Sequence, residues 1–418
     1  MRRRTLLGWG LGAAAAGVGG CATAKENKSD GGLEQGLRAA QTDPVLRKDL
    51  IAAPVILKDI DLLRLGAQFW VRVRDQDGAI GVALTNPRLM QSLWPVFLNR
   101  VAPSFRGKDA RDLEALQAEN YRWQLNYKWQ GLAYWAPIAW LEFAILDLLG
   151  KKAGLPVGAL LGGRVRETTG IYYASGNRGN SPEAELAHLQ RLVDEAGAKA
   201  VKYRLGARLS FDERSTARDL ALIPSARRQF GDDFVLYVDA NSSYDVEMSL
   251  RIGRDLEAHG YGFFEEPVRF DHYEETKQIA DALDIPIAFG EEEVSLARFA
   301  WLIRHDAAQV IQPDLLFNGG LIRAIKVARM AALRGYPCVP HISGDGFGSL
   351  YALHFASCVR NTTPYQEYKG AEDVAHQVTG ESGQLKVENG QVRIPSGPGL
   401  GITFDSEELA RAEQVNAD

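Results

Sequence analysis

Two hydrophobic patterns divide the first part of the chain. Between residues 68 and 83, apolar and polar positions alternate on either side of a QDG turn, which predicts a β-hairpin. Residues 87–150 instead carry Leu and Ala at three- and four-residue spacing, which predicts helices, the last of them ending at Gly150 and Gly154. This part of the chain is therefore predicted to be a small α+β unit.

From about residue 168 the pattern changes to short apolar runs separated by longer amphipathic stretches. Strands this apolar do not suit a sheet with one wet face, so they predict a parallel sheet covered by helices. Eight such units in succession predict a closed (β/α)₈ barrel. The expected strands are TTGIYYAS, AKAVKYR, DFVLYVDAN, YGFFEEP, PIAFGEE, AAQVIQPD, PCVPHIS and PYQEYK.

The predicted fold class is therefore α/β: a TIM-like barrel with an N-terminal α+β capping domain that the C-terminal segment completes. The expected boundaries are an export signal with a possible lipoprotein box at 1–21 and a polar linker at 22–43. The capping domain follows at 44–163 and the barrel at 164–369. Residues 370–418 are expected to return to the capping domain.

The N-terminus has the features of an export signal. Arg2 and Arg3 begin a short basic run that resembles a twin-arginine signal, and a small-residue apolar run follows to Gly20. This run is too short to cross a membrane comfortably, since a spanning helix needs about 20 apolar residues. The sequence VGGC resembles a bacterial lipoprotein cleavage box with Cys21 as the acylated residue. We expect a periplasmic or membrane-tethered protein, although Cys21 could instead be incidental to a simple signal.

The composition narrows the possible partners. The formal net charge is −5 and no other basic run appears, which argues against a nucleic-acid partner. Three cysteines are too few for a disulfide framework, and Cys338 and Cys358 are expected to be buried thiols. We expect a small carboxylate substrate, a homo-oligomer, and membrane contact only through a lipid on Cys21.

Polar residues stand at the C-terminal end of nearly every expected barrel strand. Barrel active sites are built at this end, from residues on several strands. In strand order, from the second strand to the eighth, the candidates are Lys202 and Arg204, Asp239 and Asn241, Glu265 and Glu266, Glu291 to Glu293, Asp314, His341, and Glu367.

Carboxylates on three consecutive strands would repel one another and raise each other's pKa. A hard divalent cation relieves this repulsion, and three carboxylates with open positions suit Mg²⁺. A single acid at a strand end is more commonly a helix N-cap or a solvated loop residue, but that reading does not explain the whole set. Lys202 and Arg204 are two residues apart and share one face, which suits an anionic ligand unless both are surface cations. Asp314 could orient the ring of His341 as a base.

These residues lie in motifs that resemble the enolase superfamily and, within it, the mandelate racemase subgroup of the mandelate racemase/muconate lactonizing enzyme family. The resemblance covers about residues 50–400, and AILDLLGKKAGLPVGALLGG resembles the end of that family's capping domain. Each motif is weak alone, but seven in order are specific: KYR, VDAN, FFEEP, AFGEE, QPDLLFNGG, VPH and YQEY.

The resemblance implies a Mg²⁺ site formed by Asp239, Glu265 and Glu291. In this family the first Glu of the EEP motif and the Glu directly after the Gly bind the metal. Glu265 is therefore preferred to Glu266, and Glu291 to Glu292.

The resemblance also implies catalytic roles. Asp314 and His341 resemble the family's general-base dyad, and Lys202 resembles the first Lys of a K-x-K motif that contacts the substrate carboxylate. Glu367 resembles the strand-eight Glu that hydrogen-bonds the substrate carboxylate or the enolate oxygen. Asn241 is assigned to substrate binding.

Arg204 departs from the family pattern, because racemases of this type have Lys at its position. A guanidinium is a poor general base, so Arg204 is expected to be a fixed catalytic or substrate-binding cation. With His341 as the one convincing base, the sequence favours a sugar-acid dehydratase that forms a 2-keto-3-deoxy acid. The alternatives are a racemase or epimerase on the same scaffold and a non-catalytic lipoprotein that binds sugar acids. Specificity is expected in the capping loops, at about residues 84–130, and the loop Val82–Pro87 is expected to close over the barrel.

Overall fold

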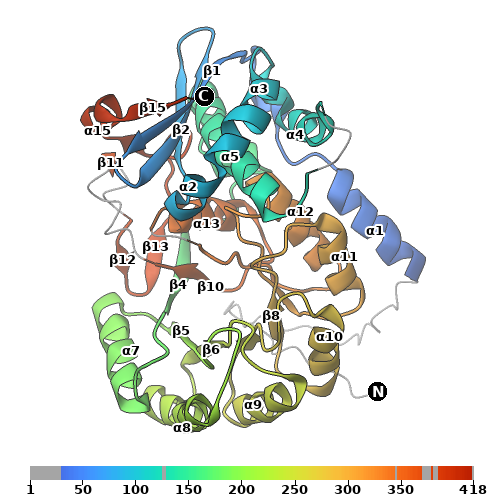
Figure 1. Ribbon diagram of the computed structural model, residues 1–418, viewed down its shortest axis with the longest axis vertical. Helices are drawn as coiled ribbons and strands as arrows, with labels where there is room; N and C mark the ends of the chain where they lie inside the picture. The colour runs from blue at the N-terminus through green and yellow to red at the C-terminus, as the bar shows by residue number, and fades with distance from the viewer. Residues whose placement is uncertain (1–29, 125–128, 344–345, 370–377, 380–384, 417–418) are drawn as a thin grey trace, which may run out of the picture.

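The computed structural model describes residues 30–124, 129–343, 346–369, 378–379 and 385–416. Figure 1 shows a barrel ringed by helices, with a smaller antiparallel sheet and its own helices above one end. The predicted export signal, Cys21 and the first residues of the predicted linker lie outside the described residues.

The capping sheet has the order β15-β1-β2-β3 and is antiparallel throughout. The predicted hairpin is confirmed as β2 and β3, whereas β1 was not predicted. The last strand, β15, joins the capping sheet from the far end of the chain, as Figure 1 shows. The elements are β1 (Leu57–Leu65), β2 (Gln68–Asp75), β3 (Ile80–Leu84), β15 (Glu413–Val415), α2 (Pro87–Val96), α3 (Ala102–Phe105), α4 (Leu113–Arg122) and α5 (Leu132–Ala153).

Helix α5 is the core helix of the cap and packs on β2 and β3. Its approach to β3 is so close that a Cβ on Gly81 would lie 2.1 Å from the carbonyl oxygen of Ala144. The helix ends at Gly154, which has a φ of +66°. By length and composition α5 could cross a membrane, but 83% of its most apolar window is buried inside the protein. Its hydrophobicity is therefore explained by the core.

The barrel strands run parallel in the order β4 to β9, and β10 pairs with β4. The prediction of a seventh strand was wrong in part, because only one parallel bridge, between Ile311 and Cys338, forms there. Pro337 and Pro340 lack the N–H groups that a longer ladder needs. The strands are β4 (Thr168–Ala174), β5 (Ala200–Arg204), β6 (Val235–Asp239), β7 (Phe263–Glu265), β8 (Ile287–Phe289), β9 (Val310–Ile311) and β10 (Tyr365–Tyr368).

Helices follow the strands and cover the barrel's outer face (Figure 1). Short α6 (Val157–Leu160) precedes the first strand. The others are α7 (Pro182–Ala196), α8 (Glu213–Phe230), α9 (Val246–Ala258), α10 (Tyr273–Ala282), α11 (Leu296–Arg304), α12 (Leu321–Ala332) and α13 (Gly346–Cys358).

The C-terminal segment reaches the cap only after it has contacted the barrel. Strand β13 (Gln391–Arg393) pairs with β12 (Val387–Glu388) and also with barrel strand β4. Strand β14 (Thr403–Phe404) pairs with β11 (Val378–Thr379), and α15 (Ser406–Arg411) leads into β15. The prediction that the C-terminal segment returns to the capping domain therefore holds for its end, at β15, whereas β13 in its middle extends the barrel sheet.

Helix α1 (Asp30–Thr42) occupies much of the region expected to be a polar linker, and that expectation was wrong there. Leu33, Leu37 and Ala40 share one face at helical spacing, and Leu37 is buried. The helix packs on α12 and α11, and Glu34 forms an ion pair with Arg304. These three apolar residues form an amphipathic stripe that is sufficient to pack the helix on its neighbours, and the linker interpretation overlooked this stripe.

The pleat of the barrel strands sorts their side chains into two sets. One set packs against the surrounding helices and includes Tyr203, which lies between Lys202 and Arg204 in the sequence. The other set forms an apolar cluster inside the barrel, which we call the barrel floor: Tyr172, Ala200, Tyr237, Phe263, Ala288, Val310 and Val339.

Candidate active site

The candidate site lies two residues further along the strands than the barrel floor, toward their C-terminal ends. Side chains two residues apart on a strand point to the same face. The polar residues that follow floor residues at this spacing therefore share the interior, at the C-terminal mouth of the barrel. They are Lys202, Asp239, Glu265, Gln312 and His341, which follow Ala200, Tyr237, Phe263, Val310 and Val339 respectively.

Strand register then places charged side chains next to one another. Arg204 pairs with Asp239 across β5 and β6, and Asp239 pairs with Glu265 across β6 and β7. Glu291 follows β8 through Gly290, whose φ is +122° and where a Cβ would lie 2.8 Å from the Phe299 ring. This turn brings Glu291 to the same mouth.

The structure brings Asp239, Glu265 and Glu291 together, the three residues expected to bind metal. All three are buried, and one carboxylate oxygen from each lies within 4.8 Å of the others. A single cation could therefore contact all three. Their hard oxygen donors fit Mg²⁺, which prefers carboxylates and keeps further positions for water or substrate.

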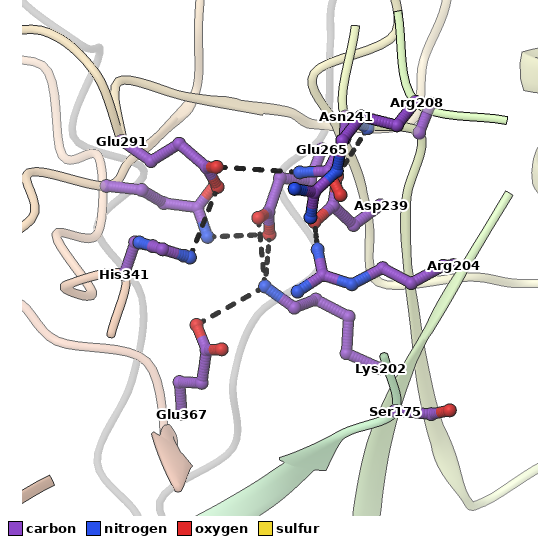
Figure 2. A network of polar contacts seen from close by, with 12 residues as sticks. Ser175, Lys202, Arg204, Arg208, Asp239, Asn241, Glu265, Glu291, His341 and Glu367 are labelled. Atoms are coloured by element: carbon purple, nitrogen blue, oxygen red, sulfur yellow. Dashed lines mark hydrogen bonds and ion pairs between the residues drawn. The ribbon is translucent and has the colours of Figure 1, made fainter. Parts of the chain in front are cut away.

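Lys202 bridges two of the site's carboxylates. Its Nζ lies 2.7 Å from Glu265 Oε2 and 3.4 Å from Glu367 Oε2, and all three side chains are buried (Figure 2). Burial alone would raise the pKa of Glu265, but the charge of Lys202 lowers it below its ordinary value. The same balance holds the pKa of Glu367 well below its ordinary value. Both carboxylates are therefore ionised and accept hydrogen bonds.

Arg204 and Asn241 flank Asp239. The Arg204 guanidinium forms an ion pair with the Asp239 carboxylate, so this cation faces the site, as expected from its spacing to Lys202. The backbone N–H of Asn241 donates to Asp239 Oδ1 at 2.6 Å, and its side-chain Nδ2 lies 3.5 Å from Glu291 Oε1. Asn241 has a φ of +42°, a conformation that Asn tolerates better than most residues. This strained turn aims its amide into the cluster.

His341 and Asp314 form the expected pair. His341 Nδ1 lies 2.8 Å from Asp314 Oδ2, and the other oxygen of Asp314 accepts from the backbone N–H of Leu316 at 2.8 Å. Across the mouth, His341 Nε2 lies 3.5 Å from Glu291 Oε2. The imidazole therefore stands between its orienting carboxylate and the acidic cluster, as Figure 2 shows for His341 and Glu291.

A second acidic group adjoins the first. Glu266, Glu291 and Glu292 offer oxygens within 4.8 Å of one another. Burial raises the pKa of Glu266 well above its ordinary value, and the charges of Glu291 and Glu292 add to the shift. Burial and the charge of Glu292 likewise raise the pKa of Glu291. Lys202 contacts Glu265 rather than Glu266, so the cation that lowers the pKa of Glu265 does not offset the shift at Glu266.

Sequence reasoning missed two residues that contact the site. Gln312 donates from Nε2 to Glu265 Oε2 at 2.9 Å, and its position two residues before Asp314 in the QPD motif could have indicated this. Arg178, in the loop after β4, donates to the side-chain oxygen of Asn241. Nothing in the sequence around Arg178 distinguishes it from a surface cation.

Comparison with known proteins identifies the family. A model described as enolase C-terminal domain-like matches residues 184–409. Arabinonate dehydratase from Saccharolobus solfataricus is 31% identical over 312 residues, which cover 72% of this chain and 78% of that protein. The chain belongs to the enolase superfamily.

Other relatives narrow the assignment of this chain to one family within the enolase superfamily. L-talarate/galactarate dehydratase from Salmonella typhimurium is 27% identical, with 83% of this chain and 82% of that protein covered. A mandelate racemase/muconate lactonizing protein from Paracoccus denitrificans, solved in complex with magnesium, is 28% identical with a TM-score of 0.77. The match covers 87% of this chain and 100% of that one. The chain is thus an enzyme of the mandelate racemase/muconate lactonizing enzyme family, and the predicted barrel and cap are confirmed as its fold class.

Proposed function

We propose that the enzyme is a Mg²⁺-dependent dehydratase that removes the α-proton of a sugar acid and eliminates its β-hydroxyl to give a 2-keto-3-deoxy acid. The observation that carries this proposal is the placement of one base, the His341–Asp314 pair, on a site that has Arg204 two residues after Lys202, where racemases of this type have a second Lys. Lys202 donates to Glu265 and Glu367 as a cation. A guanidinium does not give up its proton in this pH range, so abstraction occurs from one side. Names of relatives such as arabinonate dehydratase support this reaction class.

The tautomer of His341 follows from its contact with Asp314. An ionised carboxylate only accepts hydrogen bonds, so the proton of the neutral imidazole is on Nδ1, which lies 2.8 Å from Asp314 Oδ2. The lone pair is then on Nε2, which faces the acidic cluster where a substrate would lie. Nε2 is the atom that takes the α-proton.

The elimination balances with this one base. The α-carbon–hydrogen bond breaks, its electron pair forms the enolate, and His341 becomes protonated. The enolate then expels the β-hydroxyl, which leaves as water with the proton from His341, and the resulting enol becomes the 2-keto-3-deoxy acid. Both groups must lie on the same side of the substrate, beside Nε2.

The other side chains bind and orient the substrate. Lys202 supplies a fixed positive charge for the substrate carboxylate, Asn241 offers an amide, and Glu367, being ionised, accepts from a substrate hydroxyl or from Lys202. Arg204 adds a second fixed cation beside Asp239. These groups are already held in place before a substrate arrives, which lowers the cost of organising them.

Asp239, Glu265 and Glu291 would hold the Mg²⁺ ion. Each offers a buried oxygen within 4.8 Å of the others, and a divalent cation would favour the ionised form of all three. When bound, the ion supplies positive charge that stabilises the enolate oxygens.

A screen of sugar acids tests the proposal. The purified enzyme is incubated with each acid and Mg²⁺, and 2-keto acid formation is measured alongside α-deuterium exchange in D₂O. We expect one or more acids to give a keto acid, and EDTA to remove that activity. An epimer without keto acid would indicate a racemase or epimerase, and no exchange with any acid would favour a binding protein.

We also propose that the enzyme is exported and tethered through an acylated Cys21. The support is the basic and apolar N-terminus with its VGGC sequence. A Cys21→Ala variant should then leave the membrane fraction, because the lipid that attaches the barrel to the bilayer would be missing. Ser29→Ala is the matched control. Unchanged fractionation of the Cys21→Ala variant would contradict acylation.

A further inference from the structure

A pocket of about 520 Å³ lies at the barrel rim, between the loop after β4 and the loop after β5. Its lining carries three cations, Arg178, Arg214 and Arg218, against one acid, Asp212. The carboxylates of the candidate metal site are not among its lining residues. We refer to it as the arginine pocket.

Arg218 lines this pocket, and one of its hydrogen-bond donors has no partner among the described residues. Its side chain is 10% exposed, its Nε donates to the Asn180 carbonyl, and its Nη1 donates to the Arg204 carbonyl and to Asp219 Oδ1, each at 2.9 Å. Its Nη2 is buried and has no hydrogen-bond partner within the described part of the chain. A buried guanidinium nitrogen without a partner is costly, so this donor indicates a missing acceptor.

Arg178 links the arginine pocket to the active site. It lines the pocket, and its Nη2 donates to the Asn241 side chain, which itself faces Glu291. Its Nε is buried and unpartnered among the residues described. Burial, with the nearby charges of Arg204 and Arg208, lowers the pKa of Arg178 to about 10. The charge of Glu291 opposes this shift without cancelling it.

Two helix ends add to this positive field. The first residues of α7 and α8 line the pocket, and the N-terminus of a helix carries partial positive charge. The one acid, Asp212, is engaged as the N-cap of α8, where its Oδ1 accepts from the Ser215 N–H at 2.7 Å. It therefore does not supply the missing acceptor for Arg218.

We propose that the arginine pocket binds a small oxyanion, and that this anion is the carboxylate at the far end of a sugar diacid whose near end lies in the active site. The shared residue Arg178 is the reason for this assignment, because it contacts the active-site amide and lines the pocket. A sugar monoacid would present a neutral hydroxyl here and leave Arg218 Nη2 without a charged acceptor. This assignment rests on the proposed dehydratase function, whereas the anion site itself does not.

Arg214→Gln tests the proposal with little risk to the fold, because Arg214 is exposed. KM and kcat are measured for a six-carbon sugar diacid and for the corresponding monoacid. We expect KM for the diacid to rise about tenfold more than KM for the monoacid, as expected for the loss of one charge-assisted hydrogen bond. Arg228→Gln, an exposed arginine near the other end of α8, is the matched control and should leave both values unchanged.

A second measurement separates the pocket from the reaction. Inorganic phosphate, added in EDTA so that no metal site forms, should raise the Tm of the wild-type and Arg228→Gln proteins more than that of Arg214→Gln. If phosphate has this effect but the diacid selectivity is absent, the occupant is a free anion and the diacid assignment is wrong. If phosphate protects all three proteins equally, the anion site itself is wrong. Because this measurement needs no turnover, it still decides the matter if no sugar acid is a substrate.

Discussion

Two carboxylates with 1% exposure each, Glu265 in the barrel mouth and Glu142 in the cap, have opposite electrostatic surroundings. Glu265 accepts from the Lys202 ammonium and the Gln312 amide, and Lys202 keeps its pKa low despite burial. Glu142 accepts from the Gln117 amide at 2.6 Å and from the backbone N–H of Ile322 at 3.1 Å. Burial raises the pKa of Glu142 to about 7, and these neutral donors only partly offset it.

The difference shows how one residue type takes two roles. In the mouth, cations and an imidazole keep Glu265 and Glu367 charged, which suits metal binding at Glu265 and hydrogen-bond acceptance at Glu367. In the cap, Glu142 is a hydrogen-bond acceptor that joins α4 and α5 to the start of α12. The packing there is tight, since a Cβ on Gly320 would lie 2.3 Å from Glu142 Oε1. Burial alone therefore does not mark an acid as catalytic, and the partners decide.

The largest expected effect is on the reaction rate, and it comes from replacing the His341 partner of Asp314 with a side chain that cannot accept a proton. His341→Asn replaces the imidazole with an amide, the kind of partner that Glu142 has. Without a proton acceptor, α-proton exchange in D₂O and dehydration should fall together by about 10²–10⁴-fold. Both rates are measured on the same substrate at saturating Mg²⁺.

His305→Asn, at an exposed position after α11, is the control for this substitution and should retain wild-type rates. A His341→Asn enzyme that exchanges the α-proton normally but no longer dehydrates would show that another group is the base. His341 would then be only the acid that protonates the leaving hydroxyl.

Removing the cation of the mouth should cost stability as well as activity. Lys202→Met leaves Glu265 and Glu367 buried without their shared counter-charge. Breaking a buried ion pair from one side destabilises proteins by about 3–5 kcal/mol. We therefore expect a loss of this size in the free energy of unfolding, measured by urea denaturation in EDTA.

Mg²⁺ sharpens this prediction, because it should stabilise Lys202→Met more than the wild-type protein by supplying positive charge to Glu265. Lys199→Met, an exposed lysine just before β5, controls for the loss of a lysine and should change little. Equal stabilisation of the Lys202→Met and wild-type proteins by Mg²⁺ would argue that the ion does not bind beside Glu265.

The mouth could be predicted from the sequence and the cap interior could not, for a physical reason. A strand of period two fixes which side chains face inward, and parallel strands align their ends, so the strand pattern by itself places Asp239 beside Glu265. Glu142 lies on a helix that is apolar on all sides, and its partners come from two other helices. No local pattern encodes contacts of that kind.

The misses have similar local causes. The seventh strand was expected from its apolar residues, but two prolines limit it to one bridge at Cys338. Helix α1 was assigned to a linker because the segment is polar and contains glycine, and tertiary contacts at Leu37 stabilise it. Arg178 reaches the site from a loop, and loop geometry is not periodic. The roles of the site residues themselves remain predictions until the variants are measured.

The smallest effect concerns Glu142 itself and depends on pH. Its pKa is about 7 in the folded protein against 4.5 when exposed, so between these values the folded state binds more protons than the unfolded state. Stability from this group is therefore present below pH 4.5 and is lost as pH rises toward 7, by on the order of 3 kcal/mol.

Glu142→Gln should remove this slope from the free energy of unfolding, measured by urea denaturation at half-unit steps between pH 4.5 and 8. The exposed Glu119→Gln should keep it, and because both variants share all other titrating groups, the difference between their curves isolates Glu142. If that difference is flat with pH, Glu142 is ionised in the cap as Glu265 is in the mouth, and neutral donors suffice to hold a buried charge.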